Sequence, residues 1–507
     1  MRLARVSGQF LRHRLDGAYY DPSALKLDAR LRQLGNARSL ESLRDAGRPI
    51  TNGVRGPEFV DGPFKLIRLQ DCVDWEVRTD LAMSISVGQF NENGRCRLRR
   101  DDIVVAIGGY VGNAAVAIDD AAAVIGQHSA RVSLAATGPM NSRFLVAYLN
   151  SEPGRIQFAR LMRGTVQQGL NLEDVQEIEV PVFSAQAQQY VSEKVRLSER
   201  LRDRARKLEA AVANTHAQYI VPPMGIDFSK RIRRLPSRSL TERLDAHFYP
   251  SAVEQYFRQL GIPTRSLDRL CSLVVNGQSR PETEQGVPQA TVTNLGRSFV
   301  AGSLRTVETP ANGSRALAFH DLLLCNAAHN KSYIGRDVTY SQVEGTYPST
   351  EVMVVRVDRT QLPASFVRHY LKTEIGNLQI QSTIRGITAH SYPTDVKLLE
   401  IPIPAVPDAD RVAWFATDDQ MLAAGRCFDA ARVLTKVATK MVEHLIDGRL
   451  AEADFVAAQK SLDAGDRNAD SGILKALRQS DAPGSKPLVA DVDALYALLD
   501  SSEEEAA

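Results

Sequence analysis

The feature that most constrains the fold of this chain is a long internal repeat. The segment NGVRGPE at residues 52–58 returns as NGQSRPE at residues 276–282, with Asn, Gly, Pro and Glu in the same places 224 residues apart. Five other pairs of segments match in the same order: RLDGAYY 14–20 with RLDAHFY 243–249, 62–71 with 286–295, 99–109 with 319–328, 143–165 with 365–387, and 177–183 with 399–405. Six matches in one order indicate that one unit has been duplicated, which has to be recognised before smaller elements are assigned.

Each copy has the pattern of a strand-rich α+β unit, with short alternating or apolar runs between Gly, Pro and Asn residues. The apolar residues between Phe144 and Met162 recur at roughly helical spacing. Pro153 interrupts this pattern, and a proline inside a helix removes a hydrogen bond and clashes with the preceding turn, so we expect two short helices there. We expect Asn52 and Asn276 to be structural, each supplying a turn with positive φ.

A long amphipathic helix is predicted after each copy, at residues 185–218 and 410–450. The apolar stripes are Val191, Val195, Leu201, Ala205, Leu208 and Val212 in the first helix, and Leu434, Val437, Met441 and Leu445 in the second. Such stripes can pair as a coiled coil, or each helix can pack on its own domain instead. The length and the order of the two helices favour mutual pairing.

Charge and cysteine usage restrict the partners and the compartment. The net charge is +2, but the residues from Ser461 onward carry ten acidic and four basic side chains, so the first 460 residues carry +8. A moderately basic body is compatible with a polyanionic partner. There is no bilayer-length apolar run, no recognisable signal peptide and no CxxC pair among the five cysteines. We therefore expect a cytoplasmic protein with no membrane contact, zinc site or disulfide framework.

The order of these segments resembles the DNA-specificity (S) subunit of type I restriction–modification systems. RLD-x-x-(Y/F)-Y, the NG turn, the strand repeat, the Y-L…G…RG helix, I-P-x-P and a long helix follow one another twice within residues 14–450. The resemblance implies an α+β fold in which two pseudo-twofold-related target-recognition domains are joined by long antiparallel coiled-coil helices. The chain then divides into a first target-recognition domain (1–184), a first spacer helix (185–219), a basic linker with the second target-recognition domain (220–405), a second spacer helix (406–450) and an acidic, partly disordered tail (451–507) without a family role.

The resemblance also implies a DNA-recognition subunit with no catalytic residue and no cofactor of its own. Each domain of such a subunit reads a few base pairs of double-stranded DNA in the major groove, so the two together read a bipartite, asymmetric site. Two adenine methyltransferase subunits, which bind S-adenosylmethionine, are the expected partners, and two translocase–nuclease subunits can join them. A helix of 34 residues is roughly 50 Å long, somewhat more than one turn of DNA, and can fix the spacing of two half-sites.

Base-reading side chains are expected on exposed loops and from residue types that hydrogen-bond to base edges. The candidates are Arg55, Asn91, Asn93, Arg95, Gln127, His128, Arg163, Gln167 and Gln168 in the first copy. In the second copy they are Gln278, Arg280, Asn294, Asn326, His329, Asn330, Lys331, Arg385, His390 and Tyr392. For each of them a solvated loop residue is the alternative. The linker residues Lys230, Arg231, Arg233, Arg234 and Arg238 either contact phosphates or face solvent.

Other functional interpretations find less support in the residues. AHNK at 328–331, with the histidines at 128 and 390, lacks a second ligand at metal-binding spacing, so no metal site is expected. GGYVGN at 108–113 lacks the Lys-Ser/Thr of a P-loop, and no NPPY-like tetrapeptide of adenine methyltransferases occurs, which assigns methylation to a partner. Two alternatives stay open: a restriction-like nuclease with scattered carboxylates, and a coiled-coil adaptor of a related phage-defence complex that no longer reads DNA.

Overall fold

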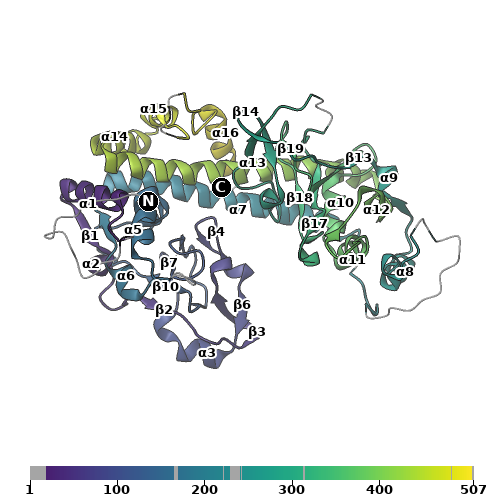
Figure 1. Cartoon of the computed structure of the whole chain (residues 1–507), viewed down its shortest axis with the longest axis horizontal. Helices are drawn as coiled ribbons and strands as arrows, with labels where there is room; N and C mark the ends of the chain where they lie inside the picture. Colours follow the sequence, from purple (N-terminus) through teal and green to yellow (C-terminus); the bar gives the residue numbers. More distant parts are fainter. Residues whose placement is uncertain are drawn as a thin grey trace. The chain divides into compact units, whose positions relative to one another are not determined.

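The computed structural model describes residues 17, 19–164, 169–220, 222–228, 240, 243–311, 315–480, 482 and 484–504. Within these residues the chain has an α+β fold that divides into two compact units. Unit 1 comprises Met1–Leu201 and Ala430–Ala507, and unit 2 comprises Arg202–Asp429. Both are shown in Figure 1, with the sequence coloured from purple to yellow. None of the described helices is long and apolar enough to cross a membrane.

The strands of unit 1 form a six-stranded, a three-stranded and a two-stranded sheet within the described residues. The strands are β1 (Ala37–Ser39), β2 (Thr51–Asn52), β3 (Phe59–Ile67), β4 (Cys72–Val73), β5 (Glu76–Val77), β6 (Met83–Ile85), β7 (Ile103–Ala106), β8 (Ala114–Val116), β9 (Ala123–Ile125), β10 (Ser129–Val132) and β11 (Glu179–Pro181). The strand orders are β2-β10-β7-β8-β5-β4, β6-β3-β9 and β1-β11. Leu66, Val104 and Val124 belong to the apolar core that joins the two larger sheets.

The described strands of unit 2 are β12 (Thr264–Ser266), β13 (Cys271–Asn276), β14 (Glu282–Ala290), β15 (Arg305–Val307), β16 (Leu322–Cys325), β17 (Ala327–Ala328), β18 (Val338–Tyr340), β19 (Tyr347–Pro348), β20 (Val352–Val357), β21 (Ala389–His390) and β22 (Glu400–Pro402). Their orders are β13-β20-β16-β18, β15-β14-β19, β12-β22 and β17-β21. Leu323, Val352 and Val354 lie in the core of this unit.

The strands β3 and β14 show that the two copies share one fold down to its irregularities. Each has nine residues, with one antiparallel and one parallel neighbour. The antiparallel pairing is interrupted between Phe59 and Phe64 in the first copy and between Glu282 and Val287 in the second. The two outer pairs, β1 with β11 and β12 with β22, also correspond. The duplication inferred from the sequence is therefore present in the backbone.

The pair of short helices expected around Pro153 is confirmed. The helices of the two copies are α1 (Pro22–Leu34), α2 (Leu40–Leu43), α3 (Val87–Glu92), α4 (Ser142–Asn150), α5 (Glu152–Leu161), α6 (Leu172–Gln176), α8 (Ser251–Leu260), α9 (Leu267–Leu270), α10 (Ala364–Leu371), α11 (Glu374–Ser382) and α12 (Pro393–Val396). Pro153 lies in the first turn of α5, where its missing N–H is not needed for the helix. The second copy has the corresponding pair, α10 and α11.

A buried glutamine ties this helix pair to the last strand of each copy. Gln157 Nε2 donates to Glu179 O at 2.7 Å, and Glu179 N donates to Gln157 Oε1 at 2.9 Å. Gln379 and Glu400 make the same two bonds at 3.0 and 2.9 Å. Each glutamine also donates to a tyrosine hydroxyl of the preceding helix. These bonds satisfy polar groups that would otherwise be buried without partners.

The repeated NG pair is required for close backbone packing. Asn52 ends β2 and Asn276 ends β13, and neither has a positive φ, so the prediction of a positive-φ asparagine was wrong. A Cβ atom on Gly53 would lie 1.9 Å from the carbonyl oxygen of Ile125, and one on Gly277 would lie 2.2 Å from that of Pro348. Glycine therefore recurs because two backbone segments touch at this point in each copy.

Two long helices follow the copies and take part in both units. These are α7 (Ala185–Ala217) and α13 (Asp408–Asp447). The start of α7 and the end of α13 belong to unit 1, whereas the end of α7 and the start of α13 belong to unit 2, so the helices run antiparallel. The predicted stripes are buried at Val191, Val195, Leu201, Ala205 and Val212 and at Leu434, Val437, Met441 and Leu445, while Leu208 is half-buried.

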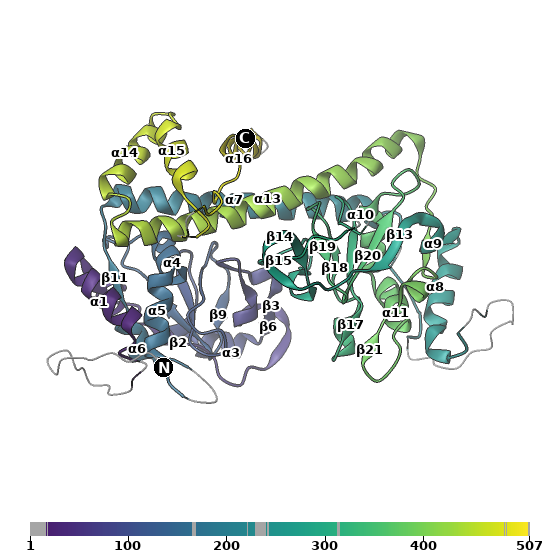
Figure 2. The same cartoon turned by 45° about the horizontal axis from the view of Figure 1, so that its top comes forward.

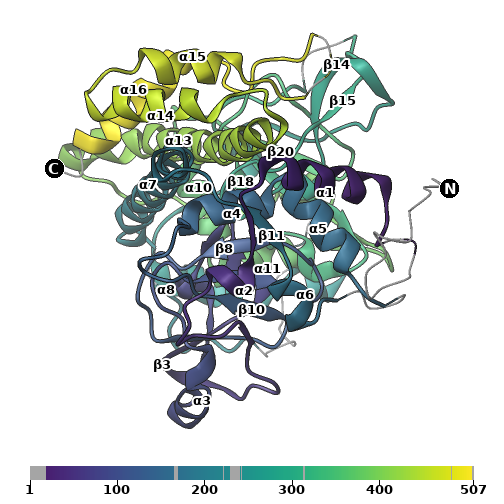
Figure 3. The same cartoon turned by 90° about the vertical axis from the view of Figure 1, so that its left-hand side faces the viewer.

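Residues 451–507, for which the sequence predicts an acidic and partly disordered tail, carry helices α14 (Glu452–Asp463), α15 (Asn468–Ala476) and α16 (Val492–Glu504). In unit 1 these helices lie against α7 and α13 (Figure 3). The ring of Phe455 packs on that of Tyr190 with centroids 5.2 Å apart. Asp470 accepts a hydrogen bond from Lys194. The buried side chains of these helices therefore pack against the rest of unit 1.

Candidate nucleic-acid interface

One edge of unit 1 brings together three loop segments that are distant in the sequence. Val54 N donates to Ile125 O at 2.8 Å, which joins the NG loop to the end of β9. Ile107 N donates to His128 O at 2.9 Å, which joins the end of β7 to the turn between β9 and β10. Leu170 N donates to Ile107 O at 2.9 Å and brings in the segment after α5. We call the described residues 53–58, 126–128, 163–164 and 169–170 loop edge 1.

Unit 2 repeats this arrangement bond for bond. Gln278 N donates to Pro348 O at 3.0 Å, and Asn326 N donates to Glu351 O at 3.0 Å. Ser391 N donates to Asn326 O at 2.8 Å. Residues 277–282, 349–351 and 385–392 form the corresponding loop edge 2. The backbone of the two edges is therefore held by equivalent hydrogen bonds.

The side chains on the two edges differ although the backbone pairing is the same. Loop edge 1 exposes Arg55, Gln127 and His128, and loop edge 2 exposes Gln278, Ser279, Thr350 and Tyr392. The side chains of Gln127 and His128 are hydrogen-bonded to each other at 3.0 Å. Arg280 is partly buried and donates to Gln278 at 3.4 Å. One scaffold thus presents two different sets of donors and acceptors.

Sequence reasoning missed Ser279 and Thr350. Ser279 N donates to Thr350 Oγ1 at 2.9 Å, and Thr350 N donates to Ser279 Oγ at 3.2 Å. Thr350 and Glu351 occupy the turn that Gln127 and His128 form in unit 1. The spacing of 224 residues between the NG motifs places Gln127 at position 351, one residue from its structural counterpart. That spacing was the signal that would have identified this turn.

Asn91, Asn93 and Arg95 lie beside loop edge 1, in α3 and the following turn. Asn91 Oδ1 accepts from Arg97 at 2.9 Å, and Asn93 Nδ2 donates to the carbonyl of Gln89 at 2.8 Å. Arg95 is exposed. The two asparagines therefore stabilise the local turn, although Asn91 is exposed like Arg95, whereas Asn93 is half-buried.

Two predicted base readers of the second copy are buried asparagines. Asn294 is 2% exposed, accepts from Thr291 N at 2.9 Å and donates to Ala301 O at 2.8 Å. Asn326 is 4% exposed and donates to Thr350 O at 3.0 Å. Both amides support loop backbone in the free protein, because a buried amide without such partners is destabilising.

The AHNK segment is exposed at the start of a short turn, η8 (Lys331–Tyr333). Asn330 Oδ1 accepts from Ser332 N at 3.0 Å and caps this turn. His329 and Lys331 are exposed. The backbone of the segment is tied to α11, since Gln381 donates to the carbonyl of Lys331 at 3.3 Å.

Arg163 and Arg385 occupy equivalent positions, and each binds a buried carboxylate. Arg163 contacts Asp174 through Nε at 3.0 Å and Nη2 at 2.6 Å. Arg385 donates to Asp395 through Nε at 2.7 Å and also through Nη2. The hydrogen bonds to these carboxylates raise the pKa of both guanidinium groups, which stay about half exposed. These two predicted base readers therefore pair with a buried charge inside the protein.

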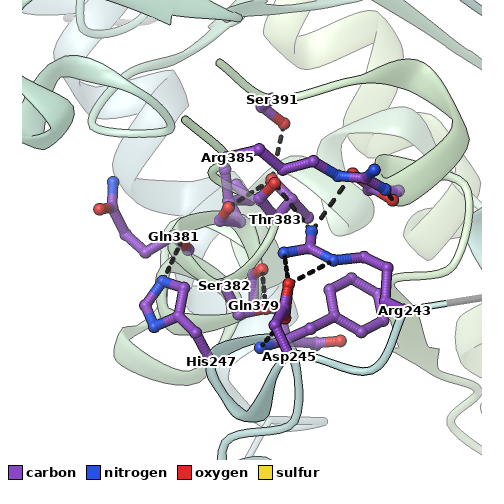
Figure 4. A network of polar contacts seen from close by, with 12 residues as sticks. Arg243, Asp245, His247, Gln379, Gln381, Ser382, Thr383, Arg385 and Ser391 are labelled. Carbon is purple, nitrogen blue, oxygen red and sulfur yellow. Dashed lines mark hydrogen bonds and ion pairs between the residues drawn. The ribbon is translucent and has the colours of Figure 1, made fainter. Parts of the chain in front are cut away.

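Arg385 is one of two arginines that donate to Asp395, and Figure 4 shows both arginines. Arg243, the first residue of the RLD motif, donates to Asp395 at 3.2 Å and to the carbonyl of Thr383 at 3.0 Å. Asp245, the third residue of the motif, accepts from Arg243 Nε at 3.0 Å. In unit 2 the RLD motif therefore stabilises the carboxylate of Asp395 and the backbone at Thr383, which support loop edge 2.

Replacing Arg163 or Arg385 by alanine is expected to destabilise its unit. Asp174 would keep the backbone N–H of Asn171 but lose its arginine, so Arg163→Ala should cost about 2–3 kcal/mol, the penalty of an unpaired buried acceptor. Arg385→Ala should cost less, about 1–2 kcal/mol, because Arg243 still binds Asp395. Urea unfolding of the three proteins measures both effects.

Arg55→Ala is the matched control, since Arg55 is exposed on the same loop edge as Arg163 and should change stability by less than about 0.5 kcal/mol. Equal stability of all three variants would mean that the two carboxylates reach solvent once the arginine is gone.

Some sequence predictions fall outside the described residues. Gln167 and Gln168 belong to the segment 165–168, and the basic residues of the linker belong to the segment 229–239, so neither set is placed. Among the residues that the structure does describe, no group of three His, Cys, Asp or Glu side chains is arranged to bind a metal ion.

No family model matches the sequence, and no curated protein matches it. Similar solved structures include the type I restriction–modification S subunit from M. genitalium, which is 12% identical, covers 81% of this chain and 94% of that chain, and has a TM-score of 0.37. The HsdS subunit from Thermoanaerobacter tengcongensis is 16% identical, covers 82% and 97%, and has a TM-score of 0.27. A third structure, which concerns complex assembly and conformational transition of the type I R-M system, has the same identity and TM-score and covers 82% and 98%. All three belong to the type I restriction–modification family that the sequence resembles.

Proposed function

We propose that this chain is a sequence-specific DNA-recognition subunit that reads a split, asymmetric site and directs partner adenine methyltransferase subunits to it. The observation that carries the proposal is the pair of loop edges, in which one backbone arrangement occurs twice and presents different side chains each time. Identical side chains would recognise the same base sequence twice, whereas different donors and acceptors recognise two different base sequences.

The residue types on the two loop edges suit readout of base edges in the major groove. Arginine pairs bidentately with guanine, and glutamine pairs bidentately with adenine. Arg55 and Gln127 offer these groups on loop edge 1, and Arg280 and Gln278 offer them on loop edge 2. Asn294 and Asn326 support the loops in this proposal and are not among the reading residues.

The partners follow from the sequence resemblance. We assign methyl transfer from S-adenosylmethionine to two methyltransferase subunits and treat two translocase–nuclease subunits as further partners. This chain then needs no catalytic residue, and its contribution to the reaction is the choice of the site.

The two loop edges give a direct test with a matched pair of variants. Arg280→Ala is expected to relax one half of the recognised site and leave the other half unchanged, and Arg55→Ala is expected to relax the opposite half. Loss of one good base contact corresponds to about 1–3 kcal/mol of discrimination at one position. Sequencing of methylated genomic DNA, from cells that express each variant with the cognate methyltransferase, identifies the position.

Tyr110→Ala serves as the control, because Tyr110 is exposed on unit 1 outside the three segments that define loop edge 1. It should leave both halves of the motif unchanged. If Arg55→Ala and Arg280→Ala relax the same half, the assignment of one half-site to each unit is wrong. If the wild-type complex methylates without any sequence motif, the proposed function itself is wrong.

A further inference from the structure

The tip of loop edge 2 carries an isoleucine with no apolar neighbour. Ile387 follows Gly386, whose φ of 77° turns the chain at the tip, and its side chain is as exposed as in an extended peptide. A β-branched apolar side chain in this position gains nothing from the fold, because all of its surface stays in water. It is available for a partner that removes this surface from water.

The tip ends a hairpin whose two arms are joined by backbone hydrogen bonds. Arg385 and His390 pair through their backbones at 2.8 and 3.0 Å, and His390 in turn pairs with Ala327 of β17. The side chain of Arg385 also donates to Asp395, which accepts a second hydrogen bond from Arg243. Ile387 is therefore presented on a supported hairpin.

The surroundings of the tip match a polyanion with planar groups. The guanidinium of Arg385 lies 5.6 Å from the ring centroid of Tyr392, and the rings of His390 and Tyr392 are stacked with centroids 6.3 Å apart. Tyr392 is 45% exposed, and the half-exposed guanidinium lies beside it. The half-exposed guanidinium of Arg385, although it binds Asp395, and the rings of His390 and Tyr392 suit phosphates and bases better than an apolar protein surface.

The hairpin also belongs to the surface that the reading residues occupy. Asn326 links the turn at Glu351 to Ser391 through two backbone hydrogen bonds. In Figure 2 the hairpin of β21 lies at the lower end of unit 2, on the side away from α13. An apolar tip next to base-reading loops would meet DNA at the same time as they do.

We propose that Ile387 is a wedge that inserts between two base pairs beside the half-site read by unit 2 and unstacks them. This inference rests on the proposed function, because it takes DNA as the ligand of loop edge 2. An isoleucine has no hydrogen-bonding group and reads no base edge, so its contribution is the surface it buries between unstacked bases. Apolar side chains in other DNA-binding proteins open base steps in this way.

The test uses the full chain, alone and with its co-expressed methyltransferase, on duplexes that carry the motif found by methylome sequencing. One purine at a time is replaced by 2-aminopurine, whose fluorescence rises when its neighbours unstack. With the wild-type protein, the 2-aminopurine fluorescence should rise at one base-pair step beside the second half-site. Ile387→Ala should abolish this signal and weaken binding about tenfold, the lower end of the effect expected for burying an isoleucine. Base flipping by the methyltransferase brightens the target adenine in both proteins, so it is separated from the wedge signal.

Two further variants, one melting temperature and one base replacement distinguish the possible outcomes. Ile387→Leu should retain the signal, and Thr388→Ala, at the neighbouring exposed position, should not change it. The melting temperature of Ile387→Ala should equal that of the wild type, because its side chain makes no buried contact. If thymine-to-uracil replacement weakens binding as much as Ile387→Ala does and no step brightens, the residue contacts a thymine methyl group and the wedge is refuted.

Failure of the wedge and failure of the proposed function give different results. Specific binding by Ile387→Ala with unchanged 2-aminopurine signals overturns the wedge and leaves DNA recognition intact. Loss of the methyltransferase from the purified Ile387→Ala complex, with unchanged DNA binding by the chain alone, overturns the wedge and identifies the tip as a protein contact. Absence of any motif preference in the wild-type complex overturns the proposed function.

Discussion

Replacing Asp470 by alanine is expected to release helices α14, α15 and α16 from unit 1 at a cost of about 3–5 kcal/mol, the range for a broken buried ion pair. Asp470 and Lys194 are each 2% exposed, with 2.5 Å between the carboxylate and the ammonium group. The hydroxyls of Tyr190 and Tyr496 donate to the same carboxylate at 2.5 and 2.7 Å. The alanine leaves a buried ammonium group and two hydroxyls without their acceptor. Hydrogen exchange of the amides in residues 452–504 measures the release.

Two controls separate the ion pair from simple loss of packing. Asp470→Asn keeps the shape and should still expose α15, because the amide cannot compensate the charge of Lys194. The double variant Lys194→Met with Asp470→Leu should recover much of the stability, since apolar residues of similar size often replace a buried ion pair without loss. Unchanged exchange in Asp470→Ala would mean that the apolar contacts of the three helices suffice, with the Phe455 ring packed on Tyr190 among them.

The same network predicts a loss of stability in acid. Burial by itself raises the pKa of the Asp470 carboxyl, but the charge of Lys194 and the three side-chain hydrogen bonds outweigh burial and bring the pKa below its ordinary value of 3.8. Because the folded pKa lies below the unfolded one, the stabilisation is present above about pH 4 and is lost as the pH falls through the folded pKa. The difference between wild type and Asp470→Asn should shrink in that range.

Replacing Gly53 or Gly277 by alanine is expected to disrupt the corresponding unit by at least about 3 kcal/mol, the upper range for overpacking against atoms that cannot move aside. The added methyl groups would lie 1.9 Å from Ile125 O and 2.2 Å from Pro348 O, and both neighbours are backbone atoms. Each variant should lose hydrogen-exchange protection in its own unit and methylation specificity in its own half of the motif.

Gly472→Ala is the matched control for these two substitutions. Gly472 lies inside α15, and a Cβ atom built there has nothing within 4 Å. The change should stabilise the helix by about 0.5–1 kcal/mol, because alanine loses less backbone entropy than glycine. If the Gly53→Ala and Gly277→Ala proteins are as stable as Gly472→Ala, the two touching backbone segments in each unit can move apart without a loss of stability.

Several exposed residues of the two loop edges could be predicted from the sequence, because the duplication shows which segments correspond. Arg55, Gln127 and His128 on loop edge 1, and Gln278 and Tyr392 on loop edge 2, are exposed where base readers were expected. Their grouping into two edges required the hydrogen bonds between segments such as 107 and 128, or 326 and 351. The role of Asn294 also required the fold, because its burial depends on residues that follow it in an irregular loop.

The sequence by itself determined the duplicated α+β unit, the break at Pro153 and the buried stripes of α7 and α13. Each of these depends on spacing along the chain, which periodicity and repetition record directly. Only the tertiary structure decided why glycine recurs at positions 53 and 277, why Arg163 and Arg385 each bind a buried carboxylate, and where helices α14, α15 and α16 pack. These depend on contacts between distant segments, such as Lys194 with Asp470, 276 residues apart. No local pattern encodes which buried charge will meet which partner, because that choice follows from the packing of whole elements.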